Sequence, residues 1–169
     1  MAIIHLDDHV TSNFTWGELI GSTTLDKYNG KHPQQGIDNM PNGAQQAHLR
    51  YLCEQFLQPL RDEFGPIHIN SGFRCEELNK LVGGASGSWH TYGSAADIRL
   101  PSVIIGVQMV HFIHRRFITC GIGYDELILS KRGKSHWLHV AFNAKATPLG
   151  STTCFNGNRL RVSMLDYRK

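Results

Sequence analysis

Two short segments constrain the fold of this chain most strongly, because they carry polar residues whose chemistry requires them to meet. The first runs from Ser88 to Asp97 and the second from Trp137 to His139. Small residues and a glycine separate His90 from Asp97, which favours a tight turn leading into a buried strand over a shared helix. With His139, the two segments supply two imidazoles and one carboxylate. That set is typical of a catalytic zinc site that keeps one position open.

In these residues the chain resembles the zinc D-Ala-D-Ala carboxypeptidase and endopeptidase family, which cuts bacterial cell-wall peptides and includes phage endolysins. The family pattern is S-x-H-x-x-G-x-A-x-D followed by W-x-H, matched here by Ser88, His90, Gly93, Ala95, Asp97, Trp137 and His139. Residues 71–74 and 79–85 are also similar, and the resemblance runs from about Phe14 to Phe142. It implies a hedgehog-like fold, a small antiparallel sheet with helices on one side, and Zn²⁺ bound by His90, Asp97 and His139.

The resemblance also implies roles for two residues that bind substrate. Arg74 corresponds to the family arginine that anchors the peptide, and its planar guanidinium suits two parallel hydrogen bonds to a carboxylate. The alternative is a structural ion pair with Glu76 or Glu77. Ser88 stands where the family uses a serine to contact substrate, or it is a turn residue that hydrogen-bonds its own backbone.

The general base is the point at which this chain departs from the family pattern. Many members carry an acid three residues before the last histidine, and here that residue is His136. Neutral imidazole accepts protons near pH 7, so we expect His136 to be the catalytic base. Alternation along a regular strand opposes this, because it places His136 and His139 on opposite faces unless the strand begins or bulges there. Glu126 and Asp125 are the alternatives, and only one of them can face the site.

Composition indicates one ordinary soluble domain. The chain has 169 residues, 41% of them hydrophobic, and a formal charge of +3, which does not by itself indicate a nucleic-acid partner. We expect a single domain over 1–169, with an irregular segment at 1–40, a core with the zinc site at 41–142 and a C-terminal extension at 143–169. The four cysteines form no C-x-x-C motif, which favours free thiols.

Hydrophobic periodicity predicts the α+β class, with helices and antiparallel strands segregated. Expected strands cover residues 67–71, 95–100, 124–129, 136–142 and 160–164. Expected helices cover 15–20, capped by Asn13 or Thr15, and 76–82. A longer helix starts near Pro41 in its first turn, continues through Phe64 and is kinked at Pro59. A further helix begins at Ser102, with an apolar face of Val103, Val107, Val110, His114 and Phe117.

These features together predict a zinc metallopeptidase that cleaves peptidoglycan stem peptides, as a carboxypeptidase or an endopeptidase. Residues 1–8 contain neither a basic region nor an apolar stretch, so we expect no signal peptide, and no run is long enough to span a membrane. The expected setting is a phage or prophage lysis enzyme, a monomer that is cytoplasmic until released onto the cell wall. The alternative is a binding or structural module that keeps the fold and the metal site without catalysis, an interpretation favoured by the missing acidic base.

Overall fold

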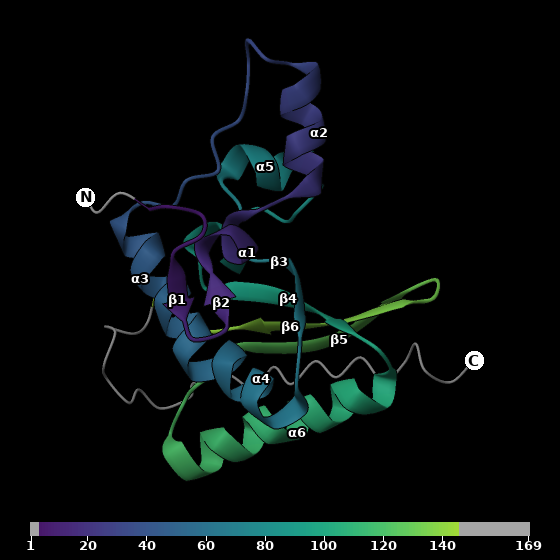
Figure 1. Ribbon diagram of the computed structural model, residues 1–169. Helices are drawn as coiled ribbons and strands as arrows, with labels where there is room; N and C mark the ends of the chain where they lie inside the picture. Colours follow the sequence, from purple (N-terminus) through teal and green to yellow (C-terminus); the bar gives the residue numbers. More distant parts are fainter. Residues whose placement is uncertain (1–3, 146–169) are drawn as a thin grey trace.

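Four antiparallel strands form the sheet around which the rest of the chain is arranged (Figure 1). The computed structural model describes residues 4–145. In it the strands lie in the order β3, β4, β6, β5, with β3 at His68–Ser71, β4 at Ala95–Leu100, β5 at Glu126–Arg132 and β6 at Ser135–Ala141. The predicted α+β class is confirmed. The predicted strand over 160–164 lies outside the described residues.

One face of the sheet is buried under helix α6 (Val103–Cys120) (Figure 1). Alternate residues of the strands supply the core there, all at most 5% exposed: Ile98, Leu100, Leu127, Leu129, Leu138 and Val140. Ser102 caps α6 as predicted, with its hydroxyl accepting from the Ile105 amide. The buried stripe of the helix is Met109, Val110 and Ile113. It is therefore rotated from the predicted face, and His114 is exposed.

The predicted long helix is divided into α3 (Gly43–Leu52), a π-helical turn (Cys53–Leu57) and α4 (Gln58–Phe64). Asn42 is the N-cap and forms a capping box with Gln45. Pro41 therefore precedes the cap, and its predicted place in the first turn was wrong. Pro59 lies at the start of α4, and the π-helical turn directly before it accommodates the missing backbone donor.

The N-terminal segment is more regular than predicted. It contains a short hairpin of β1 (His9–Thr11) and β2 (Phe14–Thr15), then α1 (Trp16–Ile20) and α2 (Thr23–Lys31). Thr15 is the residue that caps α1, in a capping box with Glu18. Helix α2 lies beside α5 (Glu76–Leu81) in a lobe on the opposite side of the sheet from α6 (Figure 1).

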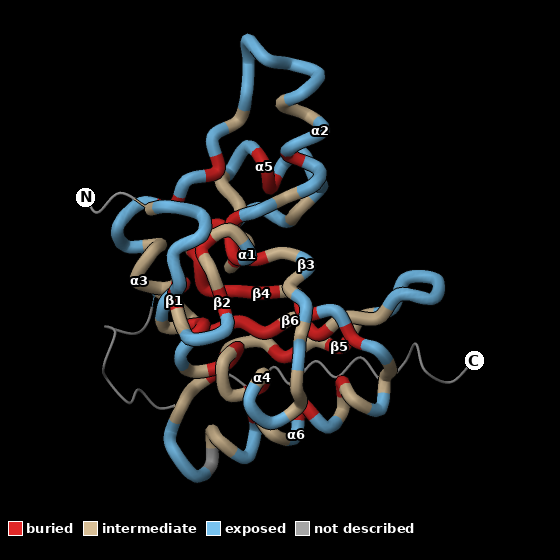
Figure 2. Tube along the Cα trace, in the orientation of Figure 1, coloured by how far each residue is buried: buried red, intermediate tan, exposed pale blue. Residues whose placement is uncertain are grey.

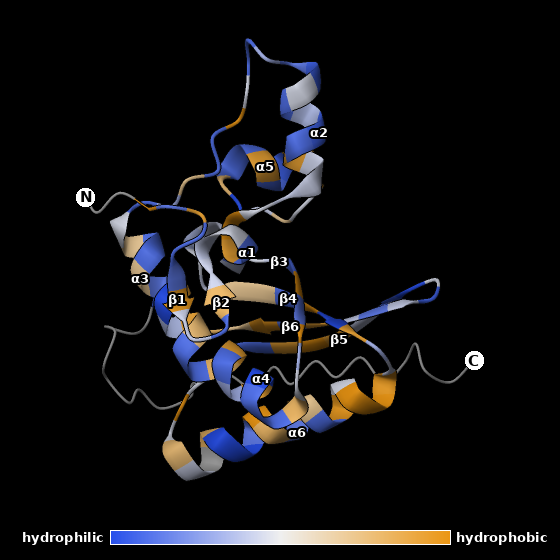
Figure 3. Ribbon diagram, viewed as in Figure 1, coloured by the Kyte–Doolittle hydropathy of each residue, from blue (hydrophilic) through white to orange (hydrophobic). Residues whose placement is uncertain are grey.

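Buried residues and hydrophobic residues are both concentrated along the central strands. The strands β4 and β6 are largely buried, while the tip of the β5–β6 hairpin is exposed (Figure 2). The same tip is strongly hydrophilic (Figure 3). No helix in the described part of the chain is both long and apolar enough to cross a membrane. Cys53, Cys75 and Cys120 are free thiols, and Cys154 lies outside the described residues.

Candidate metal centre

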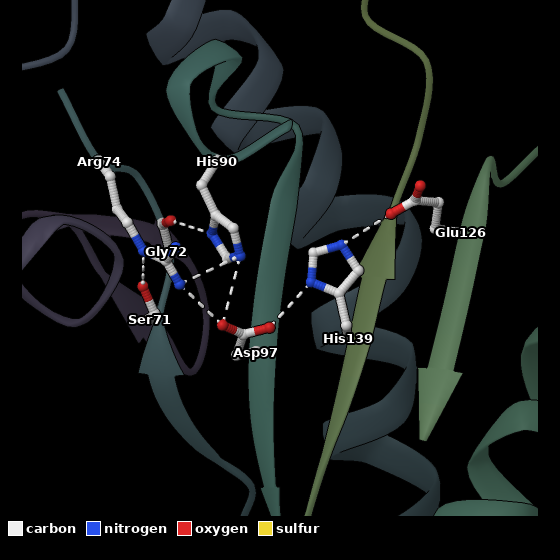
Figure 4. Close-up of polar contacts among 7 residues, drawn as sticks. All are labelled: Ser71, Gly72, Arg74, His90, Asp97, Glu126 and His139. Atoms are coloured by element: carbon white, nitrogen blue, oxygen red, sulfur yellow. Dashed lines mark hydrogen bonds and ion pairs between the residues drawn. The ribbon is translucent and has the colours of Figure 1, made fainter. Parts of the chain in front are cut away.

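Three elements bring the predicted metal ligands to one point (Figure 4). Asp97 and His139 alternate with the buried Ile98 and Leu138, so this point lies on the sheet face opposite the α6 core. His90 comes from a 3₁₀ turn (Trp89–Tyr92), Asp97 from β4 and His139 from β6. The sheet register pairs Asp97 directly with His139, so the two side chains share a face and are close neighbours. One potential ligand atom from each of the three residues lies within 4.8 Å of the others.

The turn that carries His90 depends on Gly93. Gly93 ends the 3₁₀ turn with φ +72°, a conformation that favours glycine, and its amide bonds back to the His90 carbonyl. A Cβ at this position would lie 2.7 Å from the Gln45 carbonyl oxygen of α3. The glycine of the sequence motif is therefore explained by both its backbone angle and the close approach of α3.

The His90 ring is fixed by a backbone acceptor. Its Nδ1 lies 2.6 Å from the Gly72 carbonyl oxygen and so carries the proton that bonds there. This leaves Nε2 as the ligand atom, 3.3 Å from Asp97 Oδ2. Because a metal-binding histidine usually donates its other ring N–H to such a partner, the arrangement is that of an oriented ligand.

Gly72 also joins the N-terminal segment to the site. The Phe73 amide donates to the Leu19 carbonyl at 2.7 Å, and a Cβ on Gly72 would overlap that same carbonyl. The buried Asn39 side chain donates to the carbonyls of Ile20 and Phe73. The end of α1 is therefore packed against the residue that orients His90.

The Asp97 carboxylate is the centre of the cluster. Its Oδ1 lies 2.8 Å from His139 Nδ1, and its Oδ2 lies 2.9 Å from Arg74 Nη2. Burial would raise the pKa of Asp97, but hydrogen bonds and the charges of His139 and His90 outweigh burial and hold the pKa well below its usual range. Asp97 is therefore an ionised carboxylate at neutral pH.

His139 is held between two carboxylates. Its Nδ1 faces Asp97, and its Nε2 lies 3.4 Å from Glu126 Oε2. Burial lowers the pKa of His139, but the hydrogen bonds and charges of Asp97 and Glu126 outweigh burial and raise the pKa to about 9. Of the two ring nitrogens of His139, Glu126 contacts Nε2, which points away from the cluster.

Arg74 lies against the cluster and pairs with Asp97 rather than with Glu76 or Glu77, the alternatives raised by the sequence. Its Nε donates to Ser71 Oγ at 2.8 Å and its Nη2 to Asp97. The same Nη2 lies 3.4 Å from His90 Nε2. Nη1 takes part in none of these contacts.

The structure does not bring His136 to the site. Strand β6 begins at Ser135, and its pairings with β4 and β5 run without a register shift. His136 therefore lies on the same face as Leu138, opposite His139, and its cross-strand partner is Leu100 rather than Asp97. The expected role of His136 as general base loses its geometric basis.

The other predicted site residues also include some that lie at the metal cluster and some that do not. Glu126 is on the site face, but as a partner of His139, a role that sequence reasoning missed because it considered Glu126 only as a base. Asp125 precedes β5, and its amide bonds to the Ala141 carbonyl. Ser88 accepts hydrogen bonds from Thr91 through its carbonyl, and no contact joins its hydroxyl to the cluster among the residues described.

The donor set of the cluster suits a metal ion of the zinc type. It offers two oriented imidazole nitrogens, His90 Nε2 and His139 Nδ1, and one ionised carboxylate. Such a set is typical of catalytic zinc sites, which keep a position open. A metal ion here would also replace the proton on His139 Nδ1 as the partner of Asp97.

Comparison with known proteins agrees with this site. Residues 24–130 match the Peptidase M15 family. Over 95 residues the chain is 52% identical to the zinc D-Ala-D-Ala carboxypeptidase of Streptomyces albus G, a match that covers 54% of this chain and 33% of that protein. The chain thus spans about a third of the length of the curated relative it matches. From the extent of the family match, which includes His90 and Asp97, the chain belongs to the Peptidase M15 family.

Proposed function

We propose that the protein is a zinc-dependent peptidase that cleaves the D-Ala-D-Ala-containing stem peptides of peptidoglycan. The observation that carries this proposal is the convergence of His90, Asp97 and His139, with Arg74 against the same carboxylate. Membership of the Peptidase M15 family supports the reaction type. Similarity to a protein named as a zinc D-Ala-D-Ala carboxypeptidase supports the metal and the substrate class.

The residues of the site have separable tasks in this reaction. Zinc, when bound, would supply a Lewis acid for the scissile carbonyl and would lower the pKa of an attacking water. His90 and His139 present a ligand nitrogen in a fixed tautomer, because Gly72 and Glu126 engage the other nitrogen of each ring. Asp97 remains ionised and so contributes the negative charge that a divalent ion needs.

Arg74 is suited to hold the carboxylate of the substrate. Ser71 and Asp97 fix its guanidinium through Nε and Nη2, and Nη1 remains to reach a substrate oxygen. Because the guanidinium is held beside the ligands, a carboxylate bound to it would place the neighbouring peptide bond near the metal. Positioning of this kind lowers a reaction barrier without further chemistry from the residue.

The experiment that tests the proposal measures zinc content and turnover together. Purified protein is expected to contain one zinc per chain by elemental analysis and to release D-Ala from a D-Ala-D-Ala peptide. Chelation is expected to stop turnover, and added zinc to restore it. The His139→Ala variant is expected to lose both zinc and turnover. Zinc without turnover on any stem peptide would instead support a binding or structural module.

We further propose a phage or prophage lysis enzyme as the setting, on the basis of the motif resemblance to a family that includes phage endolysins. A lysis enzyme has to cut a bond whose loss weakens the wall. Purified sacculi are therefore expected to lose turbidity when the protein is added. Release of terminal D-Ala without loss of turbidity would indicate a carboxypeptidase with another biological role.

A further inference from the structure

The sheet face that carries the metal cluster continues beyond it as a basic and aromatic surface. Along each strand, alternate residues share a face, so Asp97 is followed by Arg99 on β4, and His139 is preceded by Trp137 on β6. Arg99 and Trp137 are directly paired in the register. The next residues on the two strands, Leu100 and Leu138, are buried in the core beneath α6, so this surface lies on the opposite face of the sheet.

Strand β5 extends the same surface toward the hairpin tip. Ser130 is the β5 partner of Trp137, and Arg132 stands two residues further along. Arg132 is therefore a diagonal neighbour of Trp137. The Cα atoms of such neighbours are about 7–8 Å apart, which is within reach of long side chains. We call Arg99, Trp137, Ser130 and Arg132 the basic strip. Arg99 and Arg132 are exposed, and Trp137 is half-buried.

The charges on the four strands are strongly separated. The acidic residues of β3 to β6 are Asp97 and Glu126 alone, and both contact His139 at the metal cluster. The other end of the face carries Arg99 and Arg132. Neither of these arginines belongs to an ion pair within residues 4–145. An anionic group placed there would meet two cations with no competing acid on the strands.

The spacing of the strip fixes where that anionic group lies on a bound peptide. Strands rise about 3.3 Å per residue, so Arg99 lies about 7 Å from Asp97, and Arg132 lies about 13 Å from Ile128, the β5 partner of His139. A peptide extended along the face advances at the same rate. Its side chains therefore reach the two arginines about two to four residues from the bond at the metal.

We infer that the basic strip is a second substrate subsite, which binds a free carboxylate two to four residues from the scissile bond, with the Trp137 indole beneath the peptide. This inference rests on the proposed function. The proposed substrate has a single residue after the scissile bond, so the carboxylate lies on its N-terminal side. Arg74 and the strip would then hold two separate carboxylates of one peptide. The enzyme is accordingly selective for stem peptides that carry an acid rather than its amide at that position.

Two matched synthetic peptides test the inference. Both end in D-Ala-D-Ala and have a blocked N-terminus, and they differ only in glutamate or glutamine three residues before the scissile bond. The measurement is kcat/KM for D-Ala release by the zinc-loaded full chain. Wild type is expected to prefer the acidic peptide by about five- to tenfold at low ionic strength, mainly through KM, as for one or two charge-assisted contacts at an exposed site. Salt should reduce the preference.

The decisive variant is the double substitution Arg99→Gln with Arg132→Gln, which is expected to bring the preference close to one. The matched control is Lys27→Gln with Lys31→Gln on α2, which changes the net charge equally and is expected to keep the preference. Both altered pairs are exposed, so thermal unfolding should show intact folds. A wild type without preference, or a double variant that retains it, would overturn the subsite. Cleavage of neither peptide by wild type would overturn the proposed function and the subsite with it.

Discussion

Removal of the Glu126 carboxylate should weaken zinc binding, because Glu126 contacts the ring nitrogen of His139 that points away from the ligand cluster. Loss of such a partner typically costs 10- to 100-fold in metal affinity. Here the Nε2–Oε2 distance is 3.4 Å and the Glu126 side chain is 31% exposed, and both features weaken the contact. We therefore expect Glu126→Ala to lower zinc affinity by about tenfold, or about 1.4 kcal/mol.

Competition with a chromophoric chelator measures this affinity independently of turnover. Glu126→Gln should lose less than Glu126→Ala, because the amide oxygen still accepts from Nε2. Asp125→Asn is the control, since it removes the same charge from the neighbouring residue. Wild-type zinc affinity in Glu126→Ala would refute the orienting role. If instead Glu126→Gln kept its zinc but lost turnover more than a hundredfold at saturating zinc, Glu126 would be a proton acceptor.

Three further substitutions test the remaining assignments. Arg74→Lys should lower kcat/KM by about tenfold or more with little change in melting temperature, because lysine keeps the charge but lacks the planar pair of donors; wild-type kinetics would make Arg74 merely structural. His136→Ala should change kcat by less than about threefold, since His136 lies on the opposite face of β6 from His139; a loss of a hundredfold or more would restore it as the base. Gly93→Ala should lower the free energy of unfolding in urea by more than about 2 kcal/mol, because the left-handed conformation alone costs about 1–2 kcal/mol and the Cβ would crowd a backbone oxygen. Gly83→Ala is its control, with the same φ of +72° and open space around the Cβ; equal losses would show that the contact with α3 has no effect.

Residue patterns predicted those parts of the fold in which burial determines structure. Strands β5 and β6 have buried apolar residues at alternate positions, Leu127, Leu129, Leu138 and Val140, and α6 has a clear cap at Ser102. Helix α2 was missed because it has almost no apolar periodicity: Leu25 is its one buried residue. The β1–β2 hairpin was missed for a related reason. It pairs few residues, and the backbone bond from the Trp16 amide to the Asp8 carbonyl extends the same pairing by only one step.

In the site, too, the local sequence pattern predicted some features, and the pairing of the strands determined the others. The three expected ligands meet because β4 and β6 pair with Asp97 opposite His139. Alternation alone showed that only one of Asp125 and Glu126 could face the site, and the start of β5 decided between them. His136 was chosen from its spacing to His139 in the family pattern, against the alternation rule. The unbroken register of β6 shows that alternation was the better guide.

The packing of α1 on Gly72 makes the N-terminal segment and the ligand His90 thermodynamically linked. The Leu19 carbonyl lies so close to Gly72 that a Cβ on this residue would overlap it. The Gly72 carbonyl in turn sets the His90 tautomer. Detachment of α1 would thus release the constraint on a metal ligand. Linkage is reciprocal, so an ion bound at His90 would in turn raise the free energy required for α1 to open locally. Helix α1, which lies before the residues that match the family, would therefore contribute to the metal affinity of the site.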